Sequence, residues 1–272
     1  MKRYGLGLAA LVFLAGPASA ADLAATAYPA APPPKGSPLY SSTSLVTGDV
    51  SLGIGWTGTN GSVDKNSATG HVAGRTNFGL WSGWSEELEA TGVWNFSDNE
   101  FAGGGFSHTY YKTQNWAGGV LVGGGEMNPF ATSRSNGFLT TGVEGVVFLP
   151  HASIVGQADY TSGTSLNFWT LALEGRYYFE PNTKLTGQVA WNTNHSGASN
   201  EWMLYGAVEH RWAGTPLSTW VSANWRPATV NHASDDLWGV MVGVRYLWDQ
   251  PNGTLQSHDY EIPFSQGHDT VF

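Results

Sequence analysis

From residue 45 onward, apolar and polar residues alternate along the chain with a period of two. In residues 238–248 every second residue is apolar: Trp238, Val240, Val242, Val244, Tyr246 and Trp248. Successive side chains of a β-strand point to opposite faces, so this pattern predicts a strand with one wholly apolar face. Arg245 lies in the other register and belongs to the polar face.

Twelve such segments are found, of six to twelve residues each. They are 46–56, 72–80, 87–95, 101–112, 116–122, 139–149, 152–160, 169–179, 184–192, 202–212, 221–226 and 238–248. In residues 101–112, which are rich in glycine, the register is ambiguous. Outside the N-terminus no stretch has the i, i+3, i+4, i+7 spacing of an amphipathic helix, so the pattern predicts an all-β fold.

The connections between these segments alternate in length. Long polar stretches at 58–70, 124–137, 192–200 and 226–236 alternate with short turns at 81–84, 112–115, 149–151, 180–183 and 213–216. Two further connections, after residues 95 and 160, are shorter but keep the alternation. Long loops on one side and short periplasmic turns on the other are typical of a transmembrane β-barrel.

The composition favours a membrane barrel over a soluble one. The 272 residues include 36 Gly, 13 Trp, 11 Tyr and 12 Phe, and only 12% are charged, against roughly 25% in average domains. Ten residue steps of about 3.3 Å, tilted by about 40°, rise about 25 Å, which matches an outer-membrane apolar band. We therefore expect a closed antiparallel transmembrane β-barrel of about twelve strands, with ten or eight as alternatives.

The two ends of the chain lie outside this pattern. Residues 1–20 have Lys2 and Arg3, an apolar run and Ala18-Ser19-Ala20, which predicts a cleaved signal peptide. Residues 21–44 are rich in Ala and Pro and are expected to be a periplasmic lead-in. The barrel is expected over 45–248 and a periplasmic tail over 249–272, either extended or folded back to the barrel mouth. We expect a barrel exported by such a signal peptide to lie in the outer membrane.

Charge and cysteine content exclude several classes of function. The formal net charge of −9 argues against a nucleic-acid partner, which requires clustered Lys and Arg. The chain has no Cys, which excludes disulfides and thiolate metal sites. The eight His residues have no metal-ligand spacing, and GGVLVGGG lacks the Lys-Ser/Thr of a phosphate loop. We expect no metal and no cofactor.

The polar faces of the strands supply the candidate functional residues. Seven acids and six bases are expected to face the lumen: Asp49, Glu87, Glu89, Glu144, Asp159, Glu174, Glu209, Arg75, Arg176, Lys184, Arg211, Arg226 and Arg245. Opposite charges in a narrow tube are expected to pair. They either form a mixed-charge constriction that passes small hydrophilic solutes, or close the lumen as a structural network in a barrel that supports the envelope or binds surface partners.

A remote alternative is an outer-membrane lipid hydrolase. His195 and Ser196 lie next to each other in an expected outer loop. Adjacent residues of an extended chain point to opposite sides, and no third orienting group is evident, so we do not expect an enzyme.

Several segments resemble the alphaproteobacterial outer-membrane β-barrel proteins called the porin family. The similarity lies in ADLAATAYPAAPPP after the signal, WSEELEATG, TTGVEGVVFLP and the closing VGVRYLW. The familiar small members have eight strands, whereas twelve are counted here. The resemblance implies outer-membrane lipid and lipopolysaccharide as surroundings.

Outer-membrane strands usually finish with a signal for the barrel assembly machinery, in which a Gly is followed at three and five positions by aromatic or apolar residues. Gly243, Tyr246 and Trp248 match this pattern. The resemblance implies that the signal sits at the extreme C-terminus, whereas 24 residues follow it here.

Overall fold

A computed structural model describes residues 46–60, 65–97, 100–127, 136–163, 167–194, 201–230, 233–248 and 253–264. These residues form twelve strands and one short helix. The strands are β1 (Thr47–Asn60), β2 (Lys65–Gly79), β3 (Trp84–Asn95), β4 (Glu100–Lys112), β5 (Trp116–Met127), β6 (Asn136–Leu149), β7 (Ala152–Gly163), β8 (Asn167–Glu180), β9 (Thr183–Asn194), β10 (Glu201–Arg211), β11 (Leu217–Val230) and β12 (Ala233–Trp248). The helix is α2 (Leu255–Glu261).

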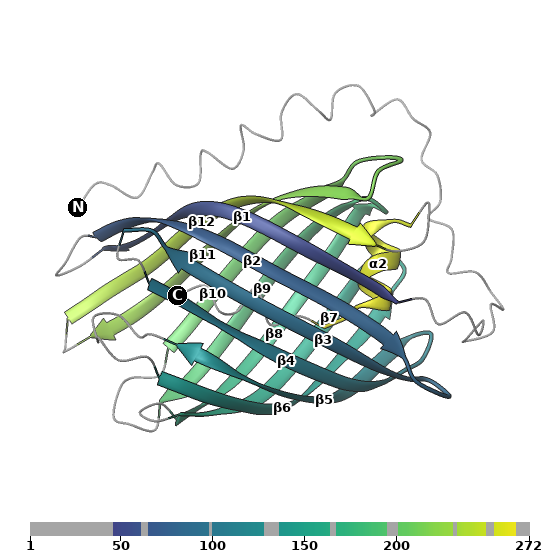
Figure 1. Ribbon diagram of the computed structural model, residues 1–272, viewed down its shortest axis with the longest axis horizontal. Coiled ribbons are helices and arrows are strands. Elements are labelled where there is room, and N and C mark those ends of the chain that lie inside the picture. Colours follow the sequence, from purple (N-terminus) through teal and green to yellow (C-terminus); the bar gives the residue numbers. More distant parts are fainter. Residues whose placement is uncertain are drawn as a thin grey trace. The chain divides into compact units, whose positions relative to one another are not determined.

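The twelve strands close into one barrel (Figure 1). Each strand pairs antiparallel with the next, and β12 pairs with β1 from Gly48 opposite Trp248 to Asn60 opposite Asp236. Closure leaves no strand edge exposed, which is what a strand protein in a bilayer requires. The prediction of a closed all-β barrel of twelve strands is confirmed.

The outer face of the wall is apolar and the inner face is polar. Along β8, Trp169, Leu173 and Phe179 are 47%, 54% and 61% exposed, whereas Glu174 and Arg176 between them are buried. The same alternation holds in β1 and β12. So continuous an apolar outer face would be unfavourable in water, because removing each such side chain from water stabilises a protein by roughly 1.5–3 kcal/mol.

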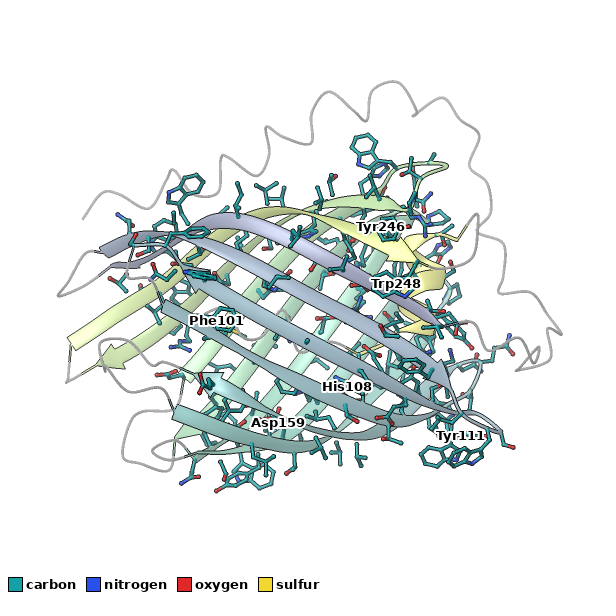
Figure 2. The ribbon with its side chains drawn as sticks, in the orientation of Figure 1. Phe101, His108, Tyr111, Asp159, Tyr246 and Trp248 are labelled. Atoms are coloured by element: carbon teal, nitrogen blue, oxygen red, sulfur yellow. The ribbon has the colours of Figure 1, made fainter. Side chains whose placement is uncertain are left out.

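Aromatic side chains contact each other near both ends of the barrel. Trp84 and Tyr111 have ring centroids 5.7 Å apart near the short turns. Trp94 and Phe101 are 5.9 Å apart near the opposite end. In Figure 2, Trp248 and Tyr111 lie toward the end that carries α2, and Phe101 lies toward the other. The outer face therefore has ring pairs at both of its borders.

Two of the four connections expected to be long are mostly strand. β1 extends to Asn60 and β2 begins at Lys65, while β11 extends to Val230 and β12 begins at Ala233. The prediction of long loops at 58–70 and 226–236 is therefore wrong. These hairpins continue beyond the apolar part of the wall, and polar strand residues carry no alternation of apolar positions.

The other two long connections are shorter than expected, because the strands again run further. β5 reaches Met127 and β6 begins at Asn136, while β9 reaches Asn194 and β10 begins at Glu201. Residues 128–135 and 195–200 lie outside the described part of the chain, as do the expected signal peptide and lead-in over 1–44.

After β12 the chain turns back into the barrel. Residues 253–264, here called the lumenal segment, comprise α2 and the three residues after it. Figure 1 shows α2 at the end of the barrel where the short turns lie. The barrel and this segment belong to one compact unit, Gly36–Phe272, and the other unit, Met1–Lys35, lies outside the described residues. No helix in the described ranges is long and apolar enough to span a membrane.

Candidate functional site

Twelve of the thirteen side chains expected to face the lumen are buried in the structure. They are Asp49, Arg75, Glu87, Glu89, Glu144, Asp159, Glu174, Arg176, Lys184, Glu209, Arg211 and Arg245. The thirteenth, Arg226, is partly exposed and lies 3.6 Å from Glu201. Because the neighbouring residues in each strand form the exposed outer face, these charged groups line the inside of the barrel.

Seven of these side chains, here together called the charge network, form ion pairs on the wall from β8 round to β2. Five of them are connected to one another, and Glu174 and Arg176 form a separate pair. The members of the charge network are Asp49, Arg75, Glu174, Arg176, Lys184, Glu209 and Arg245. Arg75 lies 2.6 Å from Asp49, and Arg245 lies 3.0 Å from Glu209 and 3.7 Å from Asp49. Lys184 lies 3.2 Å from Glu209. Pairing offsets the large desolvation cost of placing these charges inside the barrel.

Three carboxylates of β3 and β6 share one imidazole, and one of them, Glu89, lies opposite Arg75 in the β2–β3 pairing. In this acidic cluster the Nδ1 atom of His108 lies 3.0 Å from each oxygen of Glu144, and Nε2 lies 3.7 Å from Glu89. Glu87 lies directly opposite His108 in the β3–β4 pairing and is fully buried. The acids of β3 and β6 are thus kept apart from Lys184 and Arg176.

Asp159 and Arg211 lie apart from both groups. The Gln157 side chain donates a 2.7 Å hydrogen bond to Asp159 within β7. The Nε atom of Arg211 donates to the Thr215 carbonyl at 3.2 Å in the turn after β10. The structure therefore divides the expected lumen residues into two groups and three outliers, the third being Arg226.

The lumenal segment brings further charges into the lumen. Thr254 caps α2, and its hydroxyl accepts from the amide of Ser257 at 3.1 Å. His258 Nε2 lies 2.9 Å from Asp49 Oδ2. The carboxylate of Asp259 accepts from Lys184 Nζ at 2.7 Å and from the Tyr178 hydroxyl at 2.8 Å. Each contact joins α2 to an inward-facing group of the wall.

Beyond the helix the segment is held by its backbone and by one ring. The backbone carbonyl of Phe264 accepts from Arg75 Nη1 at 2.9 Å. Its ring stacks on His108 at a centroid distance of 6.2 Å and meets Tyr110 edge-on at 5.2 Å. The Glu261 carbonyl accepts from Tyr110 at 3.1 Å and from Asn77 at 3.0 Å.

The segment is also fixed to the short turns around it. Tyr260 donates its hydroxyl hydrogen to the Thr113 carbonyl at 3.1 Å. Gln256 donates from its side chain to the Pro150 carbonyl at 2.7 Å and from its backbone to the Pro181 carbonyl at 3.0 Å. Bonds to three separate turns place the segment across the mouth of the barrel at this end.

Charged neighbours control the ionisation of Asp259. Burial on its own raises the pKa of this carboxyl, but the charges of Lys184 and Arg176 hold the pKa well below its usual value. Asp259 is therefore an anion throughout the physiological pH range.

The inward face is closely packed as well as charged. Along β2 six successive inward residues are buried: Ser67, Thr69, His71, Ala73, Arg75 and Asn77. The Trp220 ring lies over two glycines that face each other across β1 and β12, Gly53 and Gly243. A cavity of about 10 Å³ remains beside Asp259, lined by charge-network residues and Thr186. This is about the volume that one water molecule needs, so little free space remains at this position.

Several residues of the site escaped the sequence analysis. His108 and Tyr110 lie in residues 101–112, where glycines obscure the register. His258, Asp259 and Phe264 lie in the tail, where no alternation exists. A helix start at Thr254 and a stop before Pro263 are present in the sequence and would have predicted α2.

Other expected sites are placed only in part. Gly243, Tyr246 and Trp248 lie in β12, with Gly243 turned inward against Trp220 and Tyr246 outward. His195 and Ser196 lie outside the described residues. Within the described ranges no group of three or more His, Asp or Glu side chains is arranged to hold a metal ion.

Comparison with known proteins shows the fold. No protein-family model matches the sequence, and no curated protein matches it. An outer-membrane channel from Pseudomonas putida F1 is similar in structure, with a TM-score of 0.51 and 12% identity over 77% of this chain and 99% of that one. The chain has the fold of outer-membrane channels.

Two further solved structures have lower scores. The KdgM porin, in complex with disordered oligogalacturonate, has a TM-score of 0.49 and 10% identity over 72% of this chain and 99% of its own. The CymD monoaromatic hydrocarbon channel has a TM-score of 0.49 and 8% identity over 76% and 90%.

Proposed function

We propose that the protein is an outer-membrane channel for the passive diffusion of small hydrophilic solutes. The observation that carries this proposal is the mixed-charge inner wall of a closed barrel whose outside is apolar. An apolar outside favours lipid, and charged groups around a lumen favour polar solutes. The N-terminal signal expected from the sequence would direct the chain across the inner membrane.

The aromatic ring pairs near both ends of the barrel support this location. The ring pairs near both ends suit the two membrane interfaces, where Trp and Tyr sit with one apolar and one hydrated side. Short turns are periplasmic in such barrels. The proposed orientation therefore places the lumenal segment at the periplasmic mouth, and the long hairpins of β1–β2 and β11–β12 outside the cell.

The lumenal segment would hold the channel closed in the described conformation. It lies across one mouth and bonds to β1, β2, β4, β8 and β9. Solute passage then requires the segment to move out of the lumen while the wall stays intact. The segment has few residues and no strand pairing, so its release would leave every strand pair of the barrel in place.

A second candidate function rests on the close packing of the lumen. The buried inward residues of β2 and the bonded tail would suit a permanently closed barrel that supports the envelope or offers its hairpins to surface partners. The two candidates differ in whether the lumenal segment ever leaves its place. A lock on this segment distinguishes them.

The test is a reversible disulfide in the full chain, which has no natural Cys. The amide of Gln256 bonds the Pro181 carbonyl at 3.0 Å, so the two backbones are close enough for a disulfide between Pro181→Cys and Gln256→Cys. In planar bilayers we expect discrete conductance steps from the reduced protein and their loss on oxidation. Reductant should restore them.

Each single-cysteine variant is a matched control and should conduct under both conditions. Steps that are equal in the oxidised and reduced double variant would mean that solutes do not pass the lumenal segment. Absence of steps from every folded form, the reduced one included, would overturn the channel and leave the closed structural barrel.

A further inference from the structure

Four groups of the wall converge on the carboxylate of Asp259. The Nζ atom of Lys184 and the hydroxyl of Tyr178 both donate to its Oδ2 atom, at 2.7 and 2.8 Å. The guanidinium groups of Arg176 and Arg245 add positive charge around it. All four wall side chains are buried, so their positive field is weakly screened by water.

The charge balance of the wall depends on this carboxylate. The charge network has four cations, Arg75, Arg176, Lys184 and Arg245, and three carboxylates, Asp49, Glu174 and Glu209. Asp259, which belongs to the lumenal segment and not to the wall, supplies a fourth negative charge. When the lumenal segment leaves, Lys184 loses one of its two carboxylate partners and keeps only Glu209.

The loss of a carboxylate falls on one position of the wall. Arg75 is held by Asp49, and Arg176 by Glu174, on the wall itself. Lys184 keeps Glu209 at 3.2 Å, which it shares with Arg245. Lys184 and the Tyr178 hydroxyl therefore lose a shared partner together, and both donors become available to another carboxylate.

We propose that this position is a carboxylate-binding site for transported solutes, and that Asp259 occupies it as a built-in competitor. The proposal rests on the channel function and narrows its solutes to small organic anions. A carboxylate fits because two donors, one charged and one neutral, already meet on a single carboxylate oxygen. The cavity of about 10 Å³ beside the site leaves no room for a bulky group while Asp259 is seated.

The contact between Asp259 and Lys184 would also explain why the segment lies in the lumen. The lumenal segment does not only fill space, because its one carboxylate in this part of the lumen lies where a solute carboxylate would bind. Solute and segment then exclude each other at Lys184. Binding of solute would favour the open channel by mass action, since it removes the position that Asp259 needs.

The test uses the full chain with Asp259→Ala, which removes the carboxylate and leaves its two donors available to a small added carboxylate. Sodium acetate is the probe, acetamide its uncharged counterpart, and sodium chloride at equal ionic strength the salt control. We expect acetate to raise the thermal midpoint of this variant well above either control, and to leave the unaltered protein unchanged. Adding Lys184→Gln should weaken acetate binding at least tenfold.

Glu261→Ala is the matched control. It removes a carboxylate from the same helix, but one that pairs with Lys112 and is half exposed. Equal effects of acetate on the two alanine variants would overturn the proposal, as would acetamide acting as well as acetate. An acetate effect that survives Lys184→Gln would overturn it too.

A second measurement serves if Asp259→Ala fails to fold. Asp259→Asn keeps the side-chain volume, and in bilayers its acetate-to-potassium permeability ratio should exceed that of the further variant Asp259→Asn with Lys184→Gln. Equal ratios would overturn the carboxylate site. Conductance without any acetate effect refutes the site and leaves the channel, whereas acetate binding without conductance refutes the channel and leaves an anion site.

Discussion

The imidazole of His258 lies 2.9 Å from the carboxylate of Asp49, although 209 positions separate them in the chain. Asp49 belongs to the first strand, and His258 to the helix that follows the last. The contact therefore links the segment after β12 to β1, the strand with which β12 closes the barrel. Seating of the lumenal segment is expected to be the final step of folding, and its loss need not open the wall.

Phe264→Ala should loosen the lumenal segment without unfolding the barrel. The ring is buried between His108 and Tyr110, and removal of a buried phenylalanine ring costs about 3–5 kcal/mol. Limited proteolysis should cleave the variant after β12 much faster than the unaltered protein. Tyr260→Phe, which removes one hydrogen bond to Thr113 worth about 1 kcal/mol, should change the rate far less. Equal cleavage rates of the two variants would contradict the packing of Phe264 described above.

Asp259 gives the seating of the segment a defined pH dependence. Its pKa is lowered in the folded state, so its stabilisation is fully present above the ordinary aspartate pKa of about 3.9. The stabilisation is lost as the pH falls through the lowered pKa. The titratable groups that face it come from four strands: Arg176, Tyr178, Lys184, Glu209 and Arg245.

The measurement is the stability difference between the unaltered protein and Asp259→Asn. We expect it to be about 3 kcal/mol at neutral pH, because the variant leaves a buried lysine with one partner fewer. It should stay constant down to about pH 5 and shrink below about pH 4. A difference that grows in acid would have the wrong sign for a lowered pKa.

Gly243→Ala should destabilise the closure of the barrel. An added Cβ would collide with the Trp220 ring and with the Leu52 carbonyl, and overpacking costs about 1–3 kcal/mol. Gly187→Ala is the matched control, because its Cβ would meet nothing within 4 Å. Unfolding in urea measures both. Trp220→Leu should partly rescue Gly243→Ala, and absence of rescue would show that the ring is not the obstacle.

The two lumen groups should act on ion selectivity in opposite directions. Glu144→Gln removes a negative charge from the acidic cluster and should reduce cation preference, while Arg245→Gln should reduce anion preference. Reversal potentials in a salt gradient measure both. Arg226→Gln, at a partly exposed position, should shift the potential less. Unchanged potentials in the first two variants would place the ion path elsewhere.

A charged residue on the outer face should lower the free energy of unfolding, and by more the closer it lies to the middle of the bilayer. Val242 lies near the middle of β12 and is about half exposed, so Val242→Arg is expected to cost about 2–4 kcal/mol in lipid. Val46, next to the start of β1, lies near the border, and Val46→Arg should cost about 1 kcal/mol or less. Equal costs, measured by unfolding in lipid vesicles, would argue against a membrane around this face.

The sequence predicted the wall of the barrel because lipid and lumen impose opposite chemistries on alternate residues. Trp169 to Phe179 on one face, with Glu174 and Arg176 on the other, specify strand, register and side together. Where a strand leaves the apolar band, this information ends. Residues 66–70 and 226–230 form strand in the structure but carry too few apolar positions to show it.

The contacts of the lumenal segment with the wall could not be predicted from local patterns. Its bonds join Asp49 to His258 and Arg75 to Phe264, at separations of 209 and 189 positions. A helix of seven residues is too short for an apolar period to be recognised. The wall side chains Asp49 and Arg75 were themselves predicted to face the lumen. Which of the charged wall side chains binds the carboxylate of Asp259 depends on all the other ion pairs of the wall.

Only residues 249–252 connect β12 to the lumenal segment. A ligand on a tether of this length acts at an effective concentration in the millimolar range. For the proposed carboxylate site this sets a lower bound, since a free solute of similar intrinsic affinity must exceed about millimolar levels to displace Asp259, and the other bonds of the segment raise that level further. Such a channel would respond to the abundance of its solute, staying shut in dilute surroundings and admitting material when the supply is rich.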